Sequence, residues 1–338
     1  MERAKTDMKK LVMKGPGKSE IIEVEDLKLK EEEEHDVIVK LKYCGVCMSE
    51  HYDWEHAEAG RSFGHEPVGV VYEIGSKVTK VKVGDRVSGP FGGGSEFSQT
   101  NENNLIRIPD NVKDEEAAIE PLGCLYSAVS KVKIPVIGDK VAVVGCGYMG
   151  CGAISLLKKR GAYVVGFDIR KECLEDALKY GADEVYTPEE WEKNHDGNLA
   201  STGLGTWDGN GGFPLVMEWG ETNESLDFAI NITAMCGQLA IGAYHTGEKR
   251  LVDVKQLNVK AIDCLSTHPR EWDLLLESCR NAMNDMEKDN WNFKHVPTKV
   301  YPITQFDNAQ GELKEKYGHY MKALVDWTKF DGEPYIID

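Results

Sequence analysis

The chain has 338 residues, 41% of them hydrophobic, and a formal charge of −17, which is long enough for two domains with separate cores. Its 57 acidic residues against 40 basic ones argue against a nucleic-acid partner, because such binding depends largely on Lys and Arg side chains that neutralise phosphates. No apolar run approaches the roughly 20 residues that cross a bilayer, and nine scattered cysteines suit a reducing compartment, so we expect a cytoplasmic protein without a membrane partner.

The first 130 residues contain short apolar segments that alternate with Gly, Asn and charged turns, a pattern typical of β strands. The expected strands are EIIEVED, HDVIVKLKYC, PVGVVYEIG, GDRVSG and NNLIRIPD. Residues 1–130 are therefore predicted to form a compact β domain.

The pattern changes at Lys131, where apolar runs begin to alternate with amphipathic helical stretches. Such alternation predicts parallel strands joined by crossover helices, and six strands make one doubly wound sheet. The six apolar runs are 141–145, 163–168, 184–186, 214–219, 238–244 and 261–266. Between the third and fourth runs, residues 195–212 are dense in Gly, Asn and Ser, which predicts a mobile surface loop in place of a crossover helix.

The end of the chain has no partner in this predicted sheet. Residues 269–286 have the apolar spacing of a helix, and a tail follows from residue 296. We expect the tail to return to the first domain. The predicted domains are therefore residues 1–130 completed by 268–338, and residues 131–267.

A glycine motif stands near the start of the second domain. Gly145-x-Gly147-x-x-Gly150 directly follows an apolar strand and opens a helix. The first glycine allows a tight turn, the second lets the backbone approach a pyrophosphate, and the third lets helix and strand pack closely. We expect the amino terminus of this helix, with Tyr148 and Met149, to hold the phosphates of a dinucleotide.

A carboxylate supports this interpretation over a plain strand-to-helix turn. Asp168 ends the next strand, 168 − 145 = 23 residues after the first glycine, close to the spacing of about 20 for the acid that binds the ribose hydroxyls. A carboxylate there would repel the 2′-phosphate of NADP, which favours NAD. Ile169 and Arg170 are expected in the same site. Arg170 can meet a phosphate, although such an arginine is more often solvated or packed on the adenine.

Three separated segments carry a second group of chemically active residues: CGVCMSEHY at 44–52, GHEPVGVV at 64–71 and EPLGCLYSA at 120–128. Together they resemble the zinc-dependent medium-chain dehydrogenases, which include alcohol, sorbitol and threonine dehydrogenases. The resemblance extends over nearly the whole chain, through GDRVSGPFGGGSEFSQ, LIRIPD and the glycine motif. It implies an α/β protein with a GroES-like β-barrel catalytic domain and a Rossmann domain with a doubly wound parallel sheet, assembled as a homodimer or homotetramer.

The resemblance also implies a set of zinc ligands. Cys47 and His65 would bind the ion, Glu66 would be the third ligand or a nearby exchanging one, and Glu120 would be the remaining carboxylate. Catalytic zinc takes about three protein ligands of these types and leaves one position open for water or substrate. Which of the two glutamates is the resting ligand stays open.

Each of these residues also has a simpler interpretation. Cys44 and Cys47 form a CxxC pair, which can be half of a zinc knuckle or a redox pair, but the chain has no second CxxC. Cys44 is therefore expected to be a buried apolar filler. A single histidine such as His65 is more often structural, and Glu120 can complement a helix amino terminus. The combination of the three segments is what favours the metal site.

A proton relay is implied beside the metal. Ser49 resembles the hydroxyl residue that takes the substrate proton in this family, and His51 the histidine that passes it to solvent. His51 lies four residues after Cys47 where the family usually has five, and Tyr52 occupies that spacing, so the exit of the relay stays open. Glu50 stands where the family usually has aspartate and is expected to orient the histidine ligand.

Two departures from the family pattern carry expectations of their own. No cysteine lies between Cys47 and Cys124, so the lobe with four cysteines found in many zinc dehydrogenases is missing, and we expect one catalytic zinc per chain and no structural zinc. The stretch from Cys47 to His65 is short, 65 − 47 = 18 residues. This trims the loop over the substrate and predicts an open pocket that suits a bulky or polar substrate.

The expected function is hydride transfer between NAD and an alcohol, which would be a secondary alcohol, a polyol or a sugar derivative. In this hypothesis zinc lowers the pKa of the bound hydroxyl, Ser49 removes the proton and NAD accepts the hydride. Two alternatives remain. One is a zinc-independent, NADPH-dependent enone or quinone reductase, against which the four metal-binding residues argue. The other is a non-catalytic dinucleotide-binding protein.

Overall fold

The computed structural model describes residues 7–134, 138–194, 211–315 and 320–337. The chain divides into two compact units, Met1–Gly123 with Leu275–Asp338, and Cys124–Leu274. Both divisions fall inside helices, α2 (Ile119–Lys131) and α9 (Trp272–Glu287). A helix that continues from one unit into the next has no turn residues to mark the division, which is why the predicted limits lie a few residues away.

The first unit is built on β strands. Its larger sheet has the strand order β16-β14-β15-β3-β4-β5-β7, with β6 paired to β3, and a separate antiparallel pair is formed by β1 and β2. The strands are β1 (Met8–Gly15), β2 (Lys18–Val24), β3 (Asp36–Val46), β4 (Pro67–Ile74), β5 (Arg86–Ser88), β6 (Phe97–Asn101), β7 (Ile106–Arg107), β14 (Thr298–Pro302), β15 (Lys322–Asp326) and β16 (Tyr335–Ile337).

Short helices connect these strands. They are η1 (Met48–Glu50), α1 (His51–His56), η2 (Glu102–Asn104), η3 (Asp114–Glu116), η4 (Asn292–Lys294), η5 (Ile303–Gln305) and α10 (Phe306–Glu315). The core of the unit contains the alternate residues Val37, Val39 and Leu41 of β3, all of them buried.

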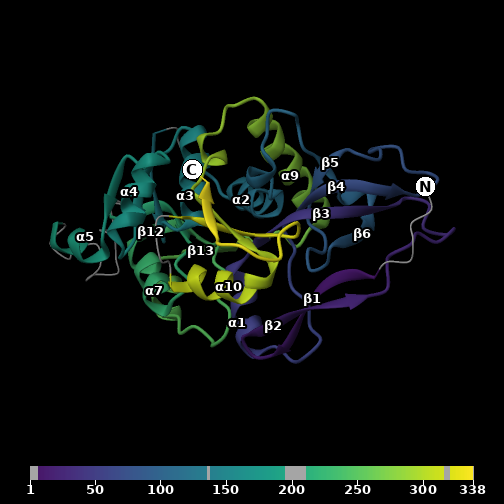
Figure 1. Ribbon diagram of the computed structural model, residues 1–338. Helices are drawn as coiled ribbons and strands as arrows, with labels where there is room; N and C mark the ends of the chain where they lie inside the picture. The colour runs from purple at the N-terminus through teal and green to yellow at the C-terminus, as the bar shows by residue number, and fades with distance from the viewer. Residues whose placement is uncertain (1–6, 135–137, 195–210, 316–319, 338) are drawn as a thin grey trace. The chain divides into compact units, whose positions relative to one another are not determined.

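The tail of the chain lies in the first unit, which includes Leu275–Asp338. β15 pairs antiparallel with β3, so that Ala323 lies opposite Val46, and Figure 1 shows the yellow strands of the tail in this unit. β1 and β6 are absent from the predicted strands, because MKKLVMKG and FSQTN contain several charged or polar residues. Backbone pairing with β2 and β3 stabilises them instead.

The second unit contains the predicted doubly wound sheet. Its strand order is β10-β9-β8-β11-β12-β13, and all five pairings are parallel. The strands are β8 (Lys140–Val144), β9 (Tyr163–Phe167), β10 (Glu184–Tyr186), β11 (Phe213–Glu218), β12 (Thr233–Ile241) and β13 (Asp263–Ser266). The order reverses between β8 and β11, which is where such sheets bind nucleotides.

Helices cover this sheet. They are α3 (Tyr148–Lys159), α4 (Lys171–Lys179), α5 (Pro188–Asn194), α7 (Asn223–Ile232) and α8 (Val254–Val259), and Figure 1 shows α4 and α7 on opposite sides of the strands. The loop predicted at residues 195–212 falls almost entirely on residues 195–210, outside those that the structure describes. None of the helices in the described part of the chain is long and apolar enough to cross a membrane.

Lys260 is a buried lysine that holds the end of α7, and its replacement by methionine is expected to destabilise the protein. Its Nζ donates to the carbonyls of Ile230, Asn231 and Thr233 at 3.0, 2.8 and 2.8 Å. These carbonyls lie where a helix leaves acceptors unpaired. Lys260→Met should lower the free energy of unfolding by about 2–4 kcal/mol, because buried acceptors lose their donor.

Urea unfolding of Lys260→Met, followed by circular dichroism, checks this prediction. Lys255 on α8 is exposed, so Lys255→Met is the matched control and should change the free energy of unfolding by no more than about 0.5 kcal/mol. Equal unfolding midpoints for the two variants would show that Lys260 does not hold the helix end.

Candidate metal site and dinucleotide site

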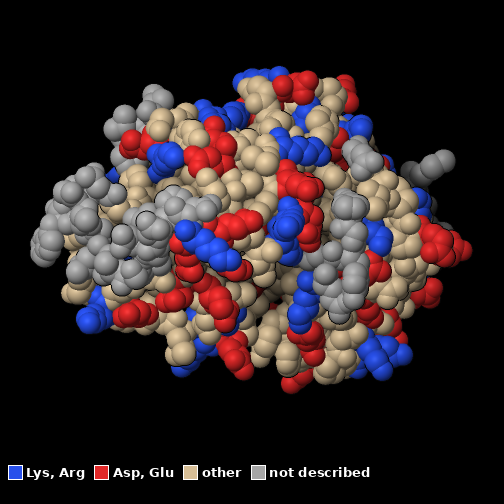
Figure 2. Space-filling model, turned by 90° about the vertical axis from the view of Figure 1, so that its left-hand side faces the viewer, with Lys and Arg blue, Asp and Glu red and all other residues tan. Residues whose placement is uncertain are grey.

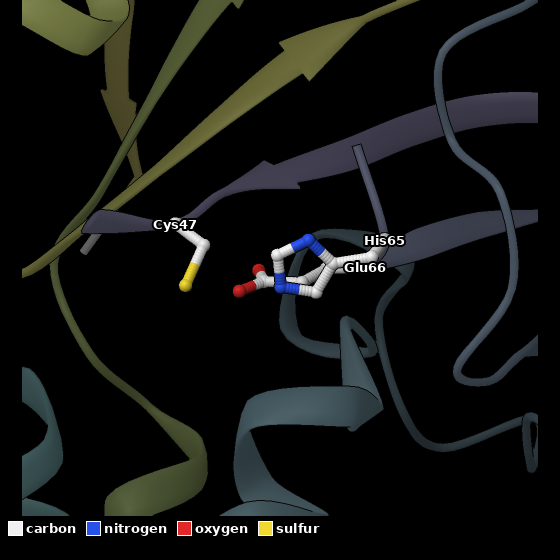
Figure 3. Close-up of side chains that lie close together, drawn as sticks. All are labelled: Cys47, His65 and Glu66. Atoms are coloured by element: carbon white, nitrogen blue, oxygen red, sulfur yellow. The ribbon is translucent and has the colours of Figure 1, made fainter. Parts of the chain in front are cut away.

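Three ligand-type side chains meet where β3 ends and β4 begins. The two strands pair antiparallel, and the backbone N–H of Gly45 donates to the carbonyl of Glu66 at 2.9 Å. Cys47 follows β3, while His65 and Glu66 precede β4. The strand pairing therefore brings Cys47 to the other two, and one ligand atom from each residue lies within 4.8 Å of the others. Figure 3 shows the sulfur, the imidazole ring and the carboxylate directed toward one another.

Glu50 orients the imidazole of His65. Its Oε1 lies 2.8 Å from Nδ1 of His65 and also accepts from the backbone N–H of Gly64 at 2.9 Å. Nδ1 must donate to the carboxylate, so Nε2 is left as the ligand atom. Burial lowers the pKa of His65, but the hydrogen bonds to Cys47 and Glu50 outweigh it and raise the pKa above its ordinary value. A position that favours a proton in this way also favours a metal cation.

Glu66 is a wholly buried carboxylate held from two sides. A Cβ atom at Gly45 would lie 2.7 Å from its Cδ, so only glycine leaves room for the carboxylate there. Lys322 Nζ lies 2.5 Å from its Oε2 and also donates to the carbonyl of Val46 at 3.2 Å. Oε1 has no hydrogen-bond partner among the described residues. A buried carboxylate oxygen of this kind fits a bound cation.

Glu120 stands in the first turn of α2. Its Oε2 lies 4.0 Å from Nε2 of His65. The structure therefore places the second predicted glutamate beside His65, although it is not one of the three residues whose ligand atoms all lie within 4.8 Å of one another.

The two predicted relay residues, Ser49 and His51, have different neighbours: Ser49 contacts Cys47, and His51 lies near Glu55. Ser49 Oγ donates to the sulfur of Cys47 at 3.2 Å, which places the hydroxyl beside the candidate zinc ligands. His51 is buried, and its Nε2 lies 3.3 Å from Oε1 of Glu55. The Glu55 side chain is 38% exposed, so His51 faces a carboxylate that reaches solvent, while Tyr52 itself is exposed.

Cys44 is buried, as expected for an apolar filler. Cβ atoms built at Gly64 and Gly93 would strike its sulfur, so the thiol fills the space that these two glycines leave. Burial raises the pKa of the thiol to about 12. A thiol that resists ionisation is a poor metal ligand.

The glycine motif forms the predicted turn between β8 and α3. Gly145 has φ +90°, and a Cβ there would lie 2.7 Å from the backbone N of Gly220. Gly147 is the residue before the first turn of α3, and a Cβ at Gly150 would strike the carbonyl of Gly145. The helix then begins with the predicted Tyr148 and Met149.

Asp168 follows β9 and is buried, while its neighbour Ile169 is 81% exposed. Its Oδ2 accepts from the backbone N–H of Cys146 at 2.8 Å, inside the glycine turn. Arg170 pairs with the same carboxylate. The structure therefore places the predicted acid beside the turn that would hold a pyrophosphate.

The sequence interpretation misses several residues that shape these sites. Lys322 and Gly45 hold Glu66, and a lysine that begins the buried strand KALVD was the available signal. In the second unit Glu218 ends β11 wholly buried and accepts from the backbone N–H of Gly220, Oγ of Ser225 and Nε2 of His245, each at 2.8 Å. Glu218 thereby fixes the turn that packs against the glycine motif.

Charged side chains of both signs are interspersed over the face of the molecule drawn in Figure 2. Acidic and basic residues also form many ion pairs within the described residues, such as Lys140 with Glu184 and Lys158 with Asp183. This face offers no continuous basic surface among the described residues that would suit a nucleic acid.

Comparison with known proteins agrees with the fold. Residues 33–123 match the family "Alcohol dehydrogenase GroES-like domain", and residues 149–281 match the family "Zinc-binding dehydrogenase". The crystal structure of 2R,3R-butanediol dehydrogenase from Bacillus subtilis is 23% identical, covers 94% of this chain and 99% of that one, and superposes with a TM-score of 0.75. These matches confirm the predicted GroES-like and Rossmann domains.

Two curated relatives are similar to this chain in sequence, one over about half of it and the other over most of it. An alcohol dehydrogenase from Geobacillus stearothermophilus is 33% identical over 49% of this chain, and the match spans 62% of that protein. A D-arabitol-phosphate dehydrogenase from Enterococcus avium is 24% identical over 94% of this chain and 97% of that protein.

Proposed function

The chain belongs to the zinc-dependent medium-chain alcohol dehydrogenase family, and we propose that it transfers hydride between NAD and a secondary alcohol, a polyol or a sugar-derived alcohol. The observation that carries this proposal is the cluster of Cys47, His65 and Glu66, in which one ligand atom from each residue lies within 4.8 Å of the others. The proposed substrate is a small molecule, and we propose a homodimer or homotetramer.

The residues present fit a zinc ion. Sulfur, imidazole nitrogen and carboxylate oxygen are the ligand types that zinc prefers in catalytic sites. Oε1 of Glu66 is buried without a partner among the described residues, and Nε2 of His65 is left as the ligand atom by the bond to Glu50. Cys47, His65 and Glu66 would hold the ion, with Glu120 as the exchanging fourth residue.

Each residue of the candidate site has its own task in this proposal. A bound zinc ion would supply a Lewis acid that lowers the pKa of the substrate hydroxyl, while NAD would carry the redox chemistry. Ser49, whose Oγ lies beside the sulfur of Cys47, would accept the hydroxyl proton as it passes its own hydroxyl proton on. His51 and the partly exposed Glu55 then offer a path for that proton toward solvent.

A polar substrate is favoured over a small aliphatic alcohol. The chain between the first two ligands is short, 65 − 47 = 18 residues, and includes the short helix α1, so little chain is available to cover the substrate. The names of the relatives point the same way, since one is a dehydrogenase of arabitol phosphate and another of butanediol. The four metal-binding residues argue against a zinc-independent enone or quinone reductase.

Metal analysis together with a substrate panel tests the proposal. We expect about one zinc per chain, loss of NAD reduction on chelation and recovery on zinc addition, with secondary alcohols and polyols preferred over ethanol. A zinc-free protein that consumes NADPH with enones would support the reductase instead. A zinc-loaded protein with no turnover on the panel would leave a non-catalytic dinucleotide-binding function as the remaining interpretation.

A further inference from the structure

The carboxylate of Asp168 is saturated by hydrogen bonds within the protein. Oδ1 accepts from the backbone N–H and from Nε of Arg170, at 2.9 and 3.1 Å. Oδ2 accepts from the backbone N–H of Cys146 at 2.8 Å and from Nη2 of Arg170 at 3.1 Å. A carboxylate offers about four acceptor positions, and all four are used. The hydroxyls of an NAD ribose must therefore displace at least one of these donors.

Arg170 is the donor that can leave. The two backbone N–H groups belong to the turn after β8 and to the start of α4, and cannot move without the elements around them. The Arg170 side chain is 29% exposed, whereas that of Asp168 is 5% exposed. The guanidinium can therefore turn away from the carboxylate while the carboxylate stays in place.

The same pair changes the charge that a nucleotide meets. An unpaired aspartate repels the 2′-phosphate of NADP, but here the positive guanidinium neutralises the carboxylate. Arg170 also stands immediately before the first turn of α4, where backbone N–H groups and the helix dipole favour an anion. A guanidinium binds phosphate through two parallel bonds, so a 2′-phosphate finds a partner in Arg170.

We propose that Arg170 sets the nucleotide preference of this protein: paired with Asp168 it weakens the binding of NAD, and turned toward the nucleotide it binds the 2′-phosphate, so that both NAD and NADP are accepted. The inference rests on the proposed dinucleotide site. It changes that proposal in one respect, because a free Asp168 would favour NAD alone.

Equilibrium binding of two adenosine fragments tests the inference without zinc, substrate or turnover. The probes are 5′-AMP, which carries the ribose hydroxyls, and 2′,5′-ADP, which carries the 2′-phosphate. Isothermal titration calorimetry gives their dissociation constants for wild type, Arg170→Met, Arg170→Lys and Asp168→Asn. Lys171→Met is the matched control, because Lys171 is the exposed neighbour of Arg170 on α4.

The expected pattern is reciprocal. In Arg170→Met the affinity for 2′,5′-ADP falls at least about tenfold, as expected when a charge-assisted bidentate contact is lost, while the affinity for 5′-AMP rises about two- to fivefold. Arg170→Lys lies between that variant and wild type. Asp168→Asn shifts the ratio of the two affinities the other way, toward 2′,5′-ADP, and Lys171→Met leaves it within about twofold.

Two failures are distinguishable. If both fragments bind wild type and Arg170→Met keeps the wild-type ratio within about twofold, the role of Arg170 is wrong, whereas the dinucleotide site stands. If neither fragment binds wild type, the proposed dinucleotide site fails as well. Folding of each variant is checked by its circular dichroism spectrum, and Arg170→Lys provides the second test should Arg170→Met fold poorly.

Discussion

Cys47→Ala is expected to lose its zinc and its activity together. In the proposed site the thiolate is the one sulfur ligand, and its removal leaves His65 with Glu66 and the exchanging Glu120, a set that we expect to bind zinc too weakly to keep it. The Lewis acid contributes several kcal/mol to transition-state stabilisation. We therefore expect kcat/KM to fall by at least about 1000-fold, with zinc content near zero by metal analysis. His65→Ala should behave in the same way.

Cys44→Ala is the matched control for this experiment, because Cys44 is the other cysteine of the CxxC pair. Its sulfur is buried among glycines rather than in the ligand cluster. The variant should retain zinc and turnover and lose about 1–2 kcal/mol of stability from the space left behind. A Cys44→Ala protein that loses zinc as completely as Cys47→Ala would mean that both cysteines bind the ion, which contradicts the ligand assignment.

Lys322→Met is expected to destabilise the protein strongly, and more strongly without metal than with it. Glu66 is wholly buried, and Lys322 Nζ lies 2.5 Å from its Oε2. Removal of the ammonium leaves an uncompensated buried carboxylate, which costs about 3–5 kcal/mol. A bound zinc ion supplies the missing positive charge. The loss of stability relative to wild type should therefore be largest after chelation and smaller in the zinc-loaded protein.

Thermal or urea unfolding with and without a chelator measures both effects. The double variant Lys322→Met/Glu66→Gln should recover part of the loss in the chelated state, because it removes the uncompensated charge. Lys314→Met is the matched control. Its partner Glu55 is 38% exposed, so the loss should stay below about 1 kcal/mol. Equal losses for Lys322→Met and Lys314→Met would show that the buried pair contributes no more than a surface pair.

Local patterns in the sequence were sufficient for much of the architecture. The apolar runs predict all six strands of the parallel sheet, because the strands buried between helices are continuous apolar segments. The glycine motif and Asp168 predict a turn whose geometry requires glycine at positive φ, and Gly145 has it. The three segments around Cys47, His65 and Glu120 were found by their combined resemblance to the zinc-dependent dehydrogenases, since each residue alone has a simpler interpretation.

Interactions between distant parts of the chain required the tertiary structure. Lys322 reaches Glu66 because β15 pairs with β3, and no local pattern specifies which strand a tail will join. β6 is a strand because β3 supplies its hydrogen-bond partners, whereas its own residues are mostly polar. The pairing of Asp168 with Arg170 depends on side-chain rotamers as well as on spacing. Local residue patterns determined most of the elements of this protein, whereas long-range strand pairing decided that Lys322 neutralises Glu66 and side-chain conformation decided that Arg170 pairs with Asp168.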